Sequence, residues 1–332
     1  MRWLKILLYT LGVLIIVYLF GPRPDAPKYT TGMPAVPATG ELDKFVAANE
    51  AAHKLRPNNE ARVVWANDSV KQKTEYAIVY IHGFSASQEE GNPVHRNIAK
   101  QFGCNLYLSR LAEHGIDTSE QLMHLTADNY WETAKQALAI GKQLGNKVIL
   151  MGTSTGGSQA LQLAATYPDD VAALILYSPN IAINDPNAWI LNNHWGLQIA
   201  RLVKGGNYNV PEDERTIYKQ YWNKPYRLEA AVALEEMLET AMTAATFNKV
   251  KQPVLLLYYY KDEEHQDKVV KVSAMKEMFT KLATDTTLKR AVALPNTGDH
   301  VIASPIKSKD VEAVERETKK FLQEIIHLKA KE

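Results

Sequence analysis

A serine between two glycines is the strongest chemical signal in the sequence. Residues 152–156 read Gly-Thr-Ser-Thr-Gly, between the strand-like segment 147–151 and a helix-like stretch. A nucleophile at such a sharp strand-to-helix turn sits in strained backbone, where a side chain on either flanking glycine would clash. The strain lifts the hydroxyl above the sheet, and the amides that begin the following helix point at any developing negative charge. The pattern predicts that Ser154 is a nucleophile.

A serine hydroxyl is a poor nucleophile without a base, so a histidine must lie near it. The chain order nucleophile, acid, histidine places that histidine late in the sequence, after the last strand. His300 fits, because it lies in the loop that follows the strand-like segment 290–294. His327 falls in the closing helix and reads as a surface residue, while His265 lies in a polar loop and would reverse the order. We therefore predict His300 as the base.

The base needs a carboxylate that holds the imidazole tautomer and stabilises its charged form. Two aspartates, Asp262 and Asp267, follow the strand-like run 254–260, and both are candidates for this acid.

An oxyanion hole is the remaining requirement of acyl transfer. A strand-like run ends at His82-Gly83, and this turn lets the backbone N–H of Phe84 face the site. The N–H of Thr155 lies just after the nucleophile, where the second donor is expected. We predict Phe84 and Thr155 as the oxyanion donors, and a structural role for His82 in bracing the loop.

The segments around these residues alternate between strand-like and helix-like patterns, which is typical of a parallel sheet covered by helices. We expect strands at 62–65, 76–81, 105–108, 147–151, 173–177, 254–259 and 290–294, and helices that include 128–144, 158–166 and 311–327.

One interval breaks this alternation. About seventy residues separate the strand that ends near Ser178 from the one that begins near Pro253, far more than an ordinary crossover needs. We predict a helical cap at 181–250, inserted into a core made of 41–180 and 251–332. The tryptophans and tyrosines of the cap would form its own small core or line an apolar substrate pocket beneath it.

The assembled motifs resemble α/β-hydrolases of the carboxylesterase and monoacylglycerol lipase type, also described as serine aminopeptidase S33 or hydrolase-4. The resemblance spans roughly 60–325 and is weak in the cap; its motifs are 82–84, 110–115, 152–157, 267–270 and 298–300. It implies the α/β-hydrolase fold, a mostly parallel doubly wound sheet with an inserted helical cap. It also favours Asp267 over Asp262, because in related enzymes such an aspartate opens the next helix. Thr155 departs from the family's usual Leu, Met or Gln.

The implied activity is hydrolysis of carboxylic esters through an acyl-enzyme on Ser154. The substrate would be a small-molecule ester or a lipid-like ester. An acyltransferase and an S33-type peptidase would use the same residues, and a hydrolase-like binding module without turnover is the alternative from another class. The sequence leaves the physiological substrate and the oligomeric state open.

The first twenty residues predict a membrane anchor. An uncharged apolar run at 6–20 follows Arg2 and Lys5, and with its flanks it approaches the thickness of a bilayer. No A-x-A-like cleavage site follows, which favours an uncleaved single-pass anchor over a secretory signal whose cleavage would release a secreted or periplasmic protein. The basic N-terminus is expected in the cytoplasm and the catalytic domain outside it. The proline- and glycine-rich segment 21–40 reads as an extended spacer.

Composition narrows the partners and cofactors. Lysine plus arginine (38) nearly balances aspartate plus glutamate (37), so the chain lacks the basic field of a nucleic-acid binder. The single cysteine, Cys104, excludes an intrachain disulfide and a cysteine-rich metal site. No metal-binding or dinucleotide-binding motif is present, so we expect no cofactor.

Overall fold

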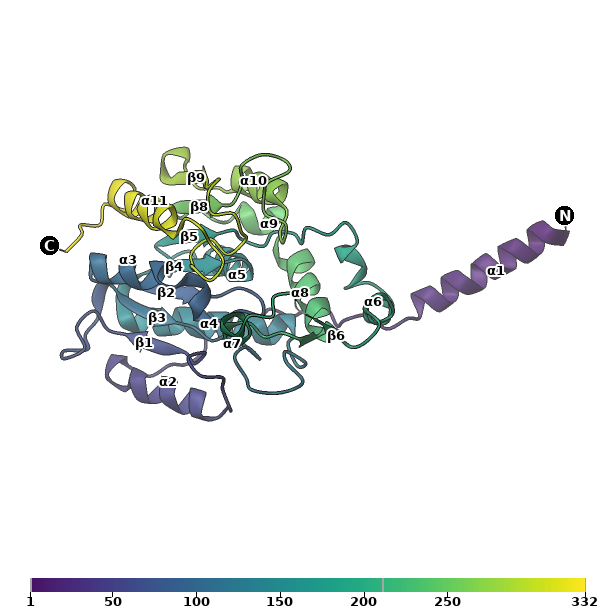
Figure 1. Ribbon diagram of the computed structural model, residues 1–332, viewed down its shortest axis with the longest axis horizontal. Helices are drawn as coiled ribbons and strands as arrows, with labels where there is room; N and C mark the ends of the chain where they lie inside the picture. The colour runs from purple at the N-terminus through teal and green to yellow at the C-terminus, as the bar shows by residue number, and fades with distance from the viewer. Residues whose placement is uncertain (1, 211, 332) are drawn as a thin grey trace.

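A seven-stranded sheet forms the centre of the computed structural model, which describes residues 2–210 and 212–331 (Figure 1). The strands are β1 (Arg62–Val64), β2 (Thr74–Ile81), β3 (Asn105–Leu108), β4 (Gly145–Thr153), β5 (Ala173–Tyr177), β8 (Val254–Tyr258) and β9 (Lys289–Ala293). Their order in the sheet is β1-β3-β2-β4-β5-β8-β9. Only the β1–β3 pair within this sheet is antiparallel, which confirms the prediction of a mostly parallel sheet.

Helices cover both faces of the sheet because the central strands are apolar on both sides. In β2, for example, Ala77 and Val79 pack into one apolar cluster and Ile78 and Tyr80 into the other, as the alternation of side chains along a strand requires. One cluster is completed by α3 (Val94–Phe102) and α11 (Val311–Glu324). The other is completed mainly by α2 (Leu42–Ala51), α4 (Ala127–Leu144), α5 (Thr155–Thr166) and α10 (Val272–Lys281).

Several element boundaries differ from those expected. The central strand β4 runs up to Thr153, and α5 begins at Thr155 instead of 158, so a single residue separates strand from helix. The glycines at 156 and 157 permit this early start, since they let the first turn of α5 pack closely against the chain around it. The closing helix α11 ends at Glu324, and His327 lies beyond it as an exposed residue with φ 59°.

The insertion between β5 and β8 is not wholly helical. It contains η3 (Ala188–Ile190), α6 (Gly196–Lys204), β6 (Tyr208–Asn209), α7 (Thr216–Tyr221), β7 (Tyr226–Arg227), α8 (Leu228–Ala241) and α9 (Ala244–Phe247). The short strands β6 and β7 pair antiparallel. Helix α8 buries side chains such as Leu234 and Met237 in the same apolar cluster as α4 and α5, so this part of the insertion belongs to the main core. We propose that the inserted region spans 181–250.

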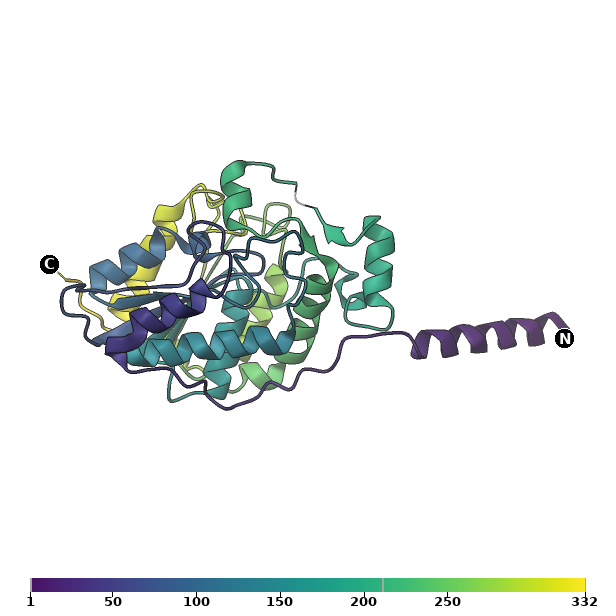
Figure 2. The same cartoon turned by 90° about the horizontal axis from the view of Figure 1, so that it is seen from below.

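The N-terminal helix α1 (Arg2–Leu19) projects away from the rest of the molecule (Figures 1 and 2). None of its 18 residues is buried, and its length and hydropathy make it a candidate transmembrane or signal helix.

The segment predicted as a spacer is extended, but it lies against the domain. Tyr29 packs against the main apolar cluster, and the ammonium of Lys135 on α4 donates hydrogen bonds to the carbonyls of Thr30 and Gly32, both at 2.8 Å. Lys135 is fully buried and pairs with Glu132 at 2.7 Å, and the extended segment supplies further acceptors for its charge.

Candidate active site

Ser154 lies alone between the end of β4 and the start of α5. Its φ of 53° and ψ of −123° place a non-glycine residue in strained backbone, as the turn motif predicts. Hydrogen bonds on both sides hold this conformation, since its N–H donates to Tyr177 O (2.9 Å) and its carbonyl accepts from the N–H groups of Gly157 (2.9 Å) and Asn180 (3.0 Å). The surrounding backbone therefore fixes the serine in one orientation.

The two glycines that flank this turn leave no room for a side chain. A Cβ on Gly152 would lie 2.5 Å from the carbonyl carbon of Gly156, and a Cβ on Gly156 would lie 2.0 Å from Ile81 O. Both contacts are with backbone atoms, which cannot move aside without disturbing the sheet. The spacing of the motif thus follows from the close approach of α5 to the ends of β2 and β4.

His300 and Asp267 meet although 33 residues separate them. The Nδ1–H of His300 donates to Asp267 Oδ2 at 2.6 Å, and both side chains are buried. The other carboxylate oxygen of Asp267 accepts from the N–H groups of Val269 (2.8 Å) and Val270 (3.1 Å). The carboxylate is therefore fixed by its own loop, and it in turn orients the imidazole ring.

Two opposing effects act on His300. Burial by itself lowers the pKa of this imidazole, but the negative charges of Asp267, Glu90 and Asp299 outweigh burial and raise the pKa above its ordinary value. Its Nε2 is buried and has no hydrogen-bond partner among residues 2–210 and 212–331. Ser154 lines the same cavity as His300, so this nitrogen is available to a group reacting there.

The alternative acid, Asp262, is engaged elsewhere. Its Oδ1 accepts hydrogen bonds from the backbone N–H and the ring Nδ1 of His265, both at 2.8 Å. The His265 hydrogen bond lowers the pKa of Asp262, and both side chains are exposed. The structure therefore brings Asp267, and not Asp262, to His300.

The loop after β2 carries Phe84, and two buried histidines brace it. His82 donates from Nδ1 to Gly83 O (2.9 Å) and accepts from the N–H of Leu111 (3.1 Å), while the N–H of Ser85 donates to His114 Nε2 (2.9 Å). Burial lowers the pKa of His82 to about 4 and lowers that of His114 as well, so both rings are neutral. His82 thus has the bracing contacts expected of it.

The expected oxyanion donors both have free N–H groups. Within the described part of the chain, no acceptor receives a hydrogen bond from the backbone N–H of Phe84 or of Thr155. Phe84 and Ser154 line one cavity, and Thr155 begins α5 directly after the serine. Both N–H groups are therefore available to donate hydrogen bonds to an anion bound beside Ser154.

Glu90 is a buried acid at the site that the sequence did not single out. It lies in η2 (Gln88–Gly91), only 2% exposed, and its Oε2 accepts from the N–H of Gly83 at 2.6 Å. Burial raises its pKa to about 7, against the opposing effects of the Gly83 hydrogen bond and of His300. The run Gln88-Glu89-Glu90 reads as an ordinary polar loop, and no spacing distinguishes the buried glutamate from its neighbour.

A cavity of about 490 Å³ lies over Ser154 between the core and the insertion. Aromatic residues of the insertion, Tyr218, Trp222 and Tyr226, line it together with Phe84. Tyr218 and Trp222 also stack on each other with ring centres 4.7 Å apart, so these aromatics serve both as packing and as pocket lining. Charged groups of both signs border the cavity as well: Glu90, Lys204, Glu212, Asp213, Lys224, Asp299 and Lys307.

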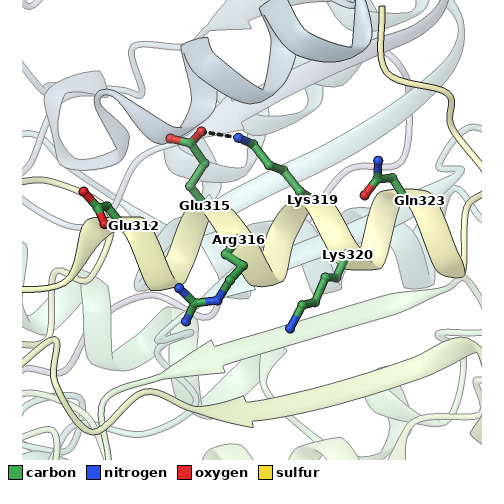
Figure 3. Close-up of a pocket in the computed structure, with 6 residues that line it drawn as sticks. All are labelled: Glu312, Glu315, Arg316, Lys319, Lys320 and Gln323. Atoms are coloured by element: carbon green, nitrogen blue, oxygen red, sulfur yellow. Dashed lines mark ion pairs between the residues drawn. The ribbon is translucent and has the colours of Figure 1, made fainter.

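A second depression, of about 460 Å³, lies along α11 and contains none of these groups. Figure 3 shows charged side chains projecting from this helix, with Glu315 and Lys319 paired at 2.7 Å. It offers neither a nucleophile nor a fixed base, so we assign the candidate site to the cavity over Ser154. Across the described residues, no group of three or more His, Cys, Asp or Glu side chains could hold a metal ion.

Comparisons with known proteins agree with this architecture. The family model described as serine aminopeptidase, S33, matches residues 72–294, more than half of the chain. A structure of the metagenome-derived lipolytic enzymes LipS and LipT is similar with a TM-score of 0.65 and 16% identity, covering 82% of this chain and 100% of that one. No curated protein matches the sequence.

Two further solved structures share the fold. Monoacylglycerol lipase from Paleococcus ferrophilus has a TM-score of 0.57 and 14% identity, covering 79% of this chain and 97% of that one. Est1E from Butyrivibrio proteoclasticus, with ferulic acid bound, has a TM-score of 0.55 and 18% identity, covering 81% of this chain and 95% of that one. Likeness at these identities shows the shared fold alone.

Proposed function

Because the chain belongs to the serine aminopeptidase S33 family of α/β-hydrolases and shares its fold with esterases and lipases, we propose that it cleaves carboxylic esters through an acyl-enzyme on Ser154. One observation carries the proposal. The strained Ser154 shares its cavity with the unpaired Nε2 of His300, whose other ring nitrogen is fixed by Asp267 at 2.6 Å. This is the relation of nucleophile, base and orienting acid that acyl transfer needs.

The reaction begins when His300 Nε2 takes the proton of the Ser154 hydroxyl. The serine oxygen attacks the ester carbonyl carbon, and the carbonyl oxygen becomes an oxyanion that the N–H groups of Phe84 and Thr155 stabilise. Asp267 stabilises the imidazolium that forms and keeps its Nε2 directed at the reacting atoms. The protonated His300 then gives its proton to the leaving alcohol, which departs and leaves the acyl group on Ser154.

In the second half of the reaction, water hydrolyses the acyl-enzyme, with His300 again acting first as a base and then as an acid. His300 takes a proton from the water as it attacks the acyl carbon, and the resulting intermediate releases the carboxylic acid and restores the serine hydroxyl. These steps need no metal or organic cofactor, so we expect the activity to survive a chelator. The proposed substrate is a small ester or a lipid-like ester.

Labelling with a fluorophosphonate probe tests the nucleophile directly. We expect the wild type to be labelled, Ser154→Ala to lose the label, and His300→Ala to react much more slowly because its serine keeps its proton. Ser273→Ala, which changes an exposed serine on α10, is the matched control and should label normally. Undiminished labelling of Ser154→Ala would exclude Ser154 as the nucleophile.

Panels of different substrates distinguish an esterase from a peptidase, an acyltransferase and a binding module. Nitrophenyl esters of increasing acyl length report ester hydrolysis, and we expect short to medium chains to be preferred because the insertion limits the pocket. Aminoacyl-naphthylamides would reveal an S33-type peptidase, and an acyl-glycerol product formed in the presence of glycerol would reveal an acyltransferase. A folded protein that turns over none of these would indicate a binding module.

For the N-terminus we propose that α1 is an uncleaved single-pass anchor, with its first residues in the cytoplasm and the catalytic domain outside. A protease added to intact cells would then digest the domain but not the N-terminus. A mature chain that begins after residue 20 would instead indicate a cleaved signal and a secreted or periplasmic protein.

A further inference from the structure

Helix α6 exposes an apolar face. Ile199, Leu202 and Val203 are 38%, 83% and 76% exposed, and their i, i+3, i+4 spacing places them on one side of the helix. A helix on the surface of a soluble domain directs such a stripe inward instead. Trp189 on the neighbouring η3 adds a large apolar side chain that is 54% exposed. We call these four residues the cap face.

The cap face begins where the N-terminal helix ends. The N–H of Trp195 donates to Pro22 O at 2.8 Å and its indole Nε1–H donates to Val17 O at 3.0 Å, while His194 Nδ1 donates to Gly21 O at 2.7 Å. Trp195 is the N-cap of α6, so these bonds join the start of α6 to the last turn of α1. In Figure 2, α6 is the part of the domain nearest to α1 and runs across the direction of α1.

An apolar chamber of about 430 Å³ adjoins the cap face. Two cap-face residues, Ile199 and Val203, line it together with Leu228 and Leu234 of α8. The chamber shares Ile183, Lys204, Asn209, Tyr226 and Leu234 with the cavity over Ser154, so the two spaces adjoin. A hydrocarbon chain lying in this chamber would thus reach toward the nucleophile from the side of α1.

We propose that the cap face docks on the bilayer that holds α1, and that the chamber beside it receives the hydrocarbon part of a lipid ester of short to medium chain length drawn from that bilayer. The surface that the cap face contacts is a bilayer because the cap face is continuous with α1. Every large apolar side chain of α1 is exposed and needs a hydrocarbon environment, and α6 is hydrogen-bonded to the end of that helix. Apolar residues in the interface add to the membrane affinity of an anchored domain.

The substrate part of this inference rests on the proposed function, whereas the docking does not. For that reason two measurements are needed, one of contact with lipid and one of turnover. Both use the full chain reconstituted in phosphatidylcholine vesicles.

Contact with lipid can be measured with a fluorophore on one cysteine. The single native cysteine, Cys104, is buried, so Leu202→Cys can be labelled selectively with an environment-sensitive dye. We expect its emission to shift to the blue and to be quenched by brominated phosphatidylcholine, but not by iodide in the water. Val70→Cys is the matched control, because Val70 is 51% exposed in the loop between β1 and β2, and it should show the opposite pattern.

Quenching of the Leu202 probe by iodide, as strongly as the Val70 probe, would overturn the docking. Protection from iodide that appears only as the protein density in the vesicles rises, without quenching by brominated lipid, would also overturn it and would indicate contact between copies of the chain.

Turnover is compared between an ester dissolved in water and a monoacyl lipid ester held in the vesicles. Leu202→Asp should lower kcat/KM for the lipid ester about tenfold, which is the order of magnitude of burying one leucine side chain. It should leave a water-soluble nitrophenyl ester unaffected, because Leu202 lies outside both cavities. Val70→Asp should change neither. Equal loss on both esters would refute uptake from the bilayer, and a wild type inactive on both would refute the esterase proposal while the fluorescence result still decides the docking.

Discussion

The buried acid Glu90 gives the sharpest prediction about stability. Replacing it with glutamine keeps an amide oxygen that can accept the Gly83 N–H, but removes the negative charge from a side chain that is 2% exposed. We expect Glu90→Gln to be more stable than the wild type at pH 8 and of similar stability near pH 4. Equilibrium unfolding of the full chain in detergent by urea, repeated between pH 4 and 8.5, measures the difference.

The sign and size of this effect follow from the raised pKa. Burial raises the pKa of Glu90 from 4.5 to about 7, so the folded chain holds this proton more tightly than the unfolded chain. The stability that this proton contributes is complete below pH 4.5 and is lost as the pH rises toward 7. Each pKa unit corresponds to roughly 1.4 kcal/mol, so the wild type loses about 3 kcal/mol at this position by pH 8. Glutamine does not titrate and avoids that loss.

The difference between the two proteins isolates Glu90 together with its charge interaction with His300, because the titrations of groups that do not interact with Glu90 occur in both and cancel. Glu89→Gln is the matched control: Glu89 lies on the same η2, and its side chain accepts a hydrogen bond from Asn92 at 2.9 Å. The control should not gain stability between pH 4 and 8. A Glu90→Gln advantage that stays constant across this range, or a variant less stable than the wild type at pH 8, would refute the assignment of a buried carboxyl with a raised pKa.

Two further predictions concern catalysis. The charge of Glu90 helps to raise the pKa of His300, so Glu90→Gln should lower that pKa and move the acidic limb of the kcat/KM profile to lower pH, since only neutral His300 acts as a base; a limb at an unchanged pH would contradict this coupling. Asp267→Asn should lower kcat by roughly 10²- to 10⁴-fold, while Asp262→Asn should change it little, as measured by nitrophenyl ester hydrolysis; the reverse ranking would reassign the acid.

The features that could be predicted best from the sequence are those whose defining residues lie close together in the chain. The turn at Ser154 could be recognised because its two glycines, the preceding apolar run and the following helix all lie within one short segment. The meeting of Asp267 with His300 could be anticipated because parallel strands direct their C-terminal loops to one edge of the sheet. Their roles in catalysis remain predictions that the variants above test.

Glu90 could not be found from the sequence for a physical reason. Its burial depends on how η2 folds back onto the loop of Gly83, and a four-residue 3-10 helix carries no periodic pattern that marks one face as inward. The neighbouring Glu89 has the same chemistry and is only half-buried. Only the three-dimensional contact with Gly83 distinguishes the two residues.

The contacts of segment 21–40 with the domain were likewise not predictable from the sequence, and they restrain the domain relative to α1. Proline and glycine predicted an extended spacer, and it is extended, but composition could not show that its carbonyls are acceptors for Lys135 or that the N–H groups of Lys28 and Tyr29 bond to Asp128. Together with the bonds from α6 to residues 17–22, these contacts hold the chain to the domain at two places. A domain tied in this way cannot swivel as it would on a free linker. The direction in which the cap face and the cavity over Ser154 open is therefore set relative to α1.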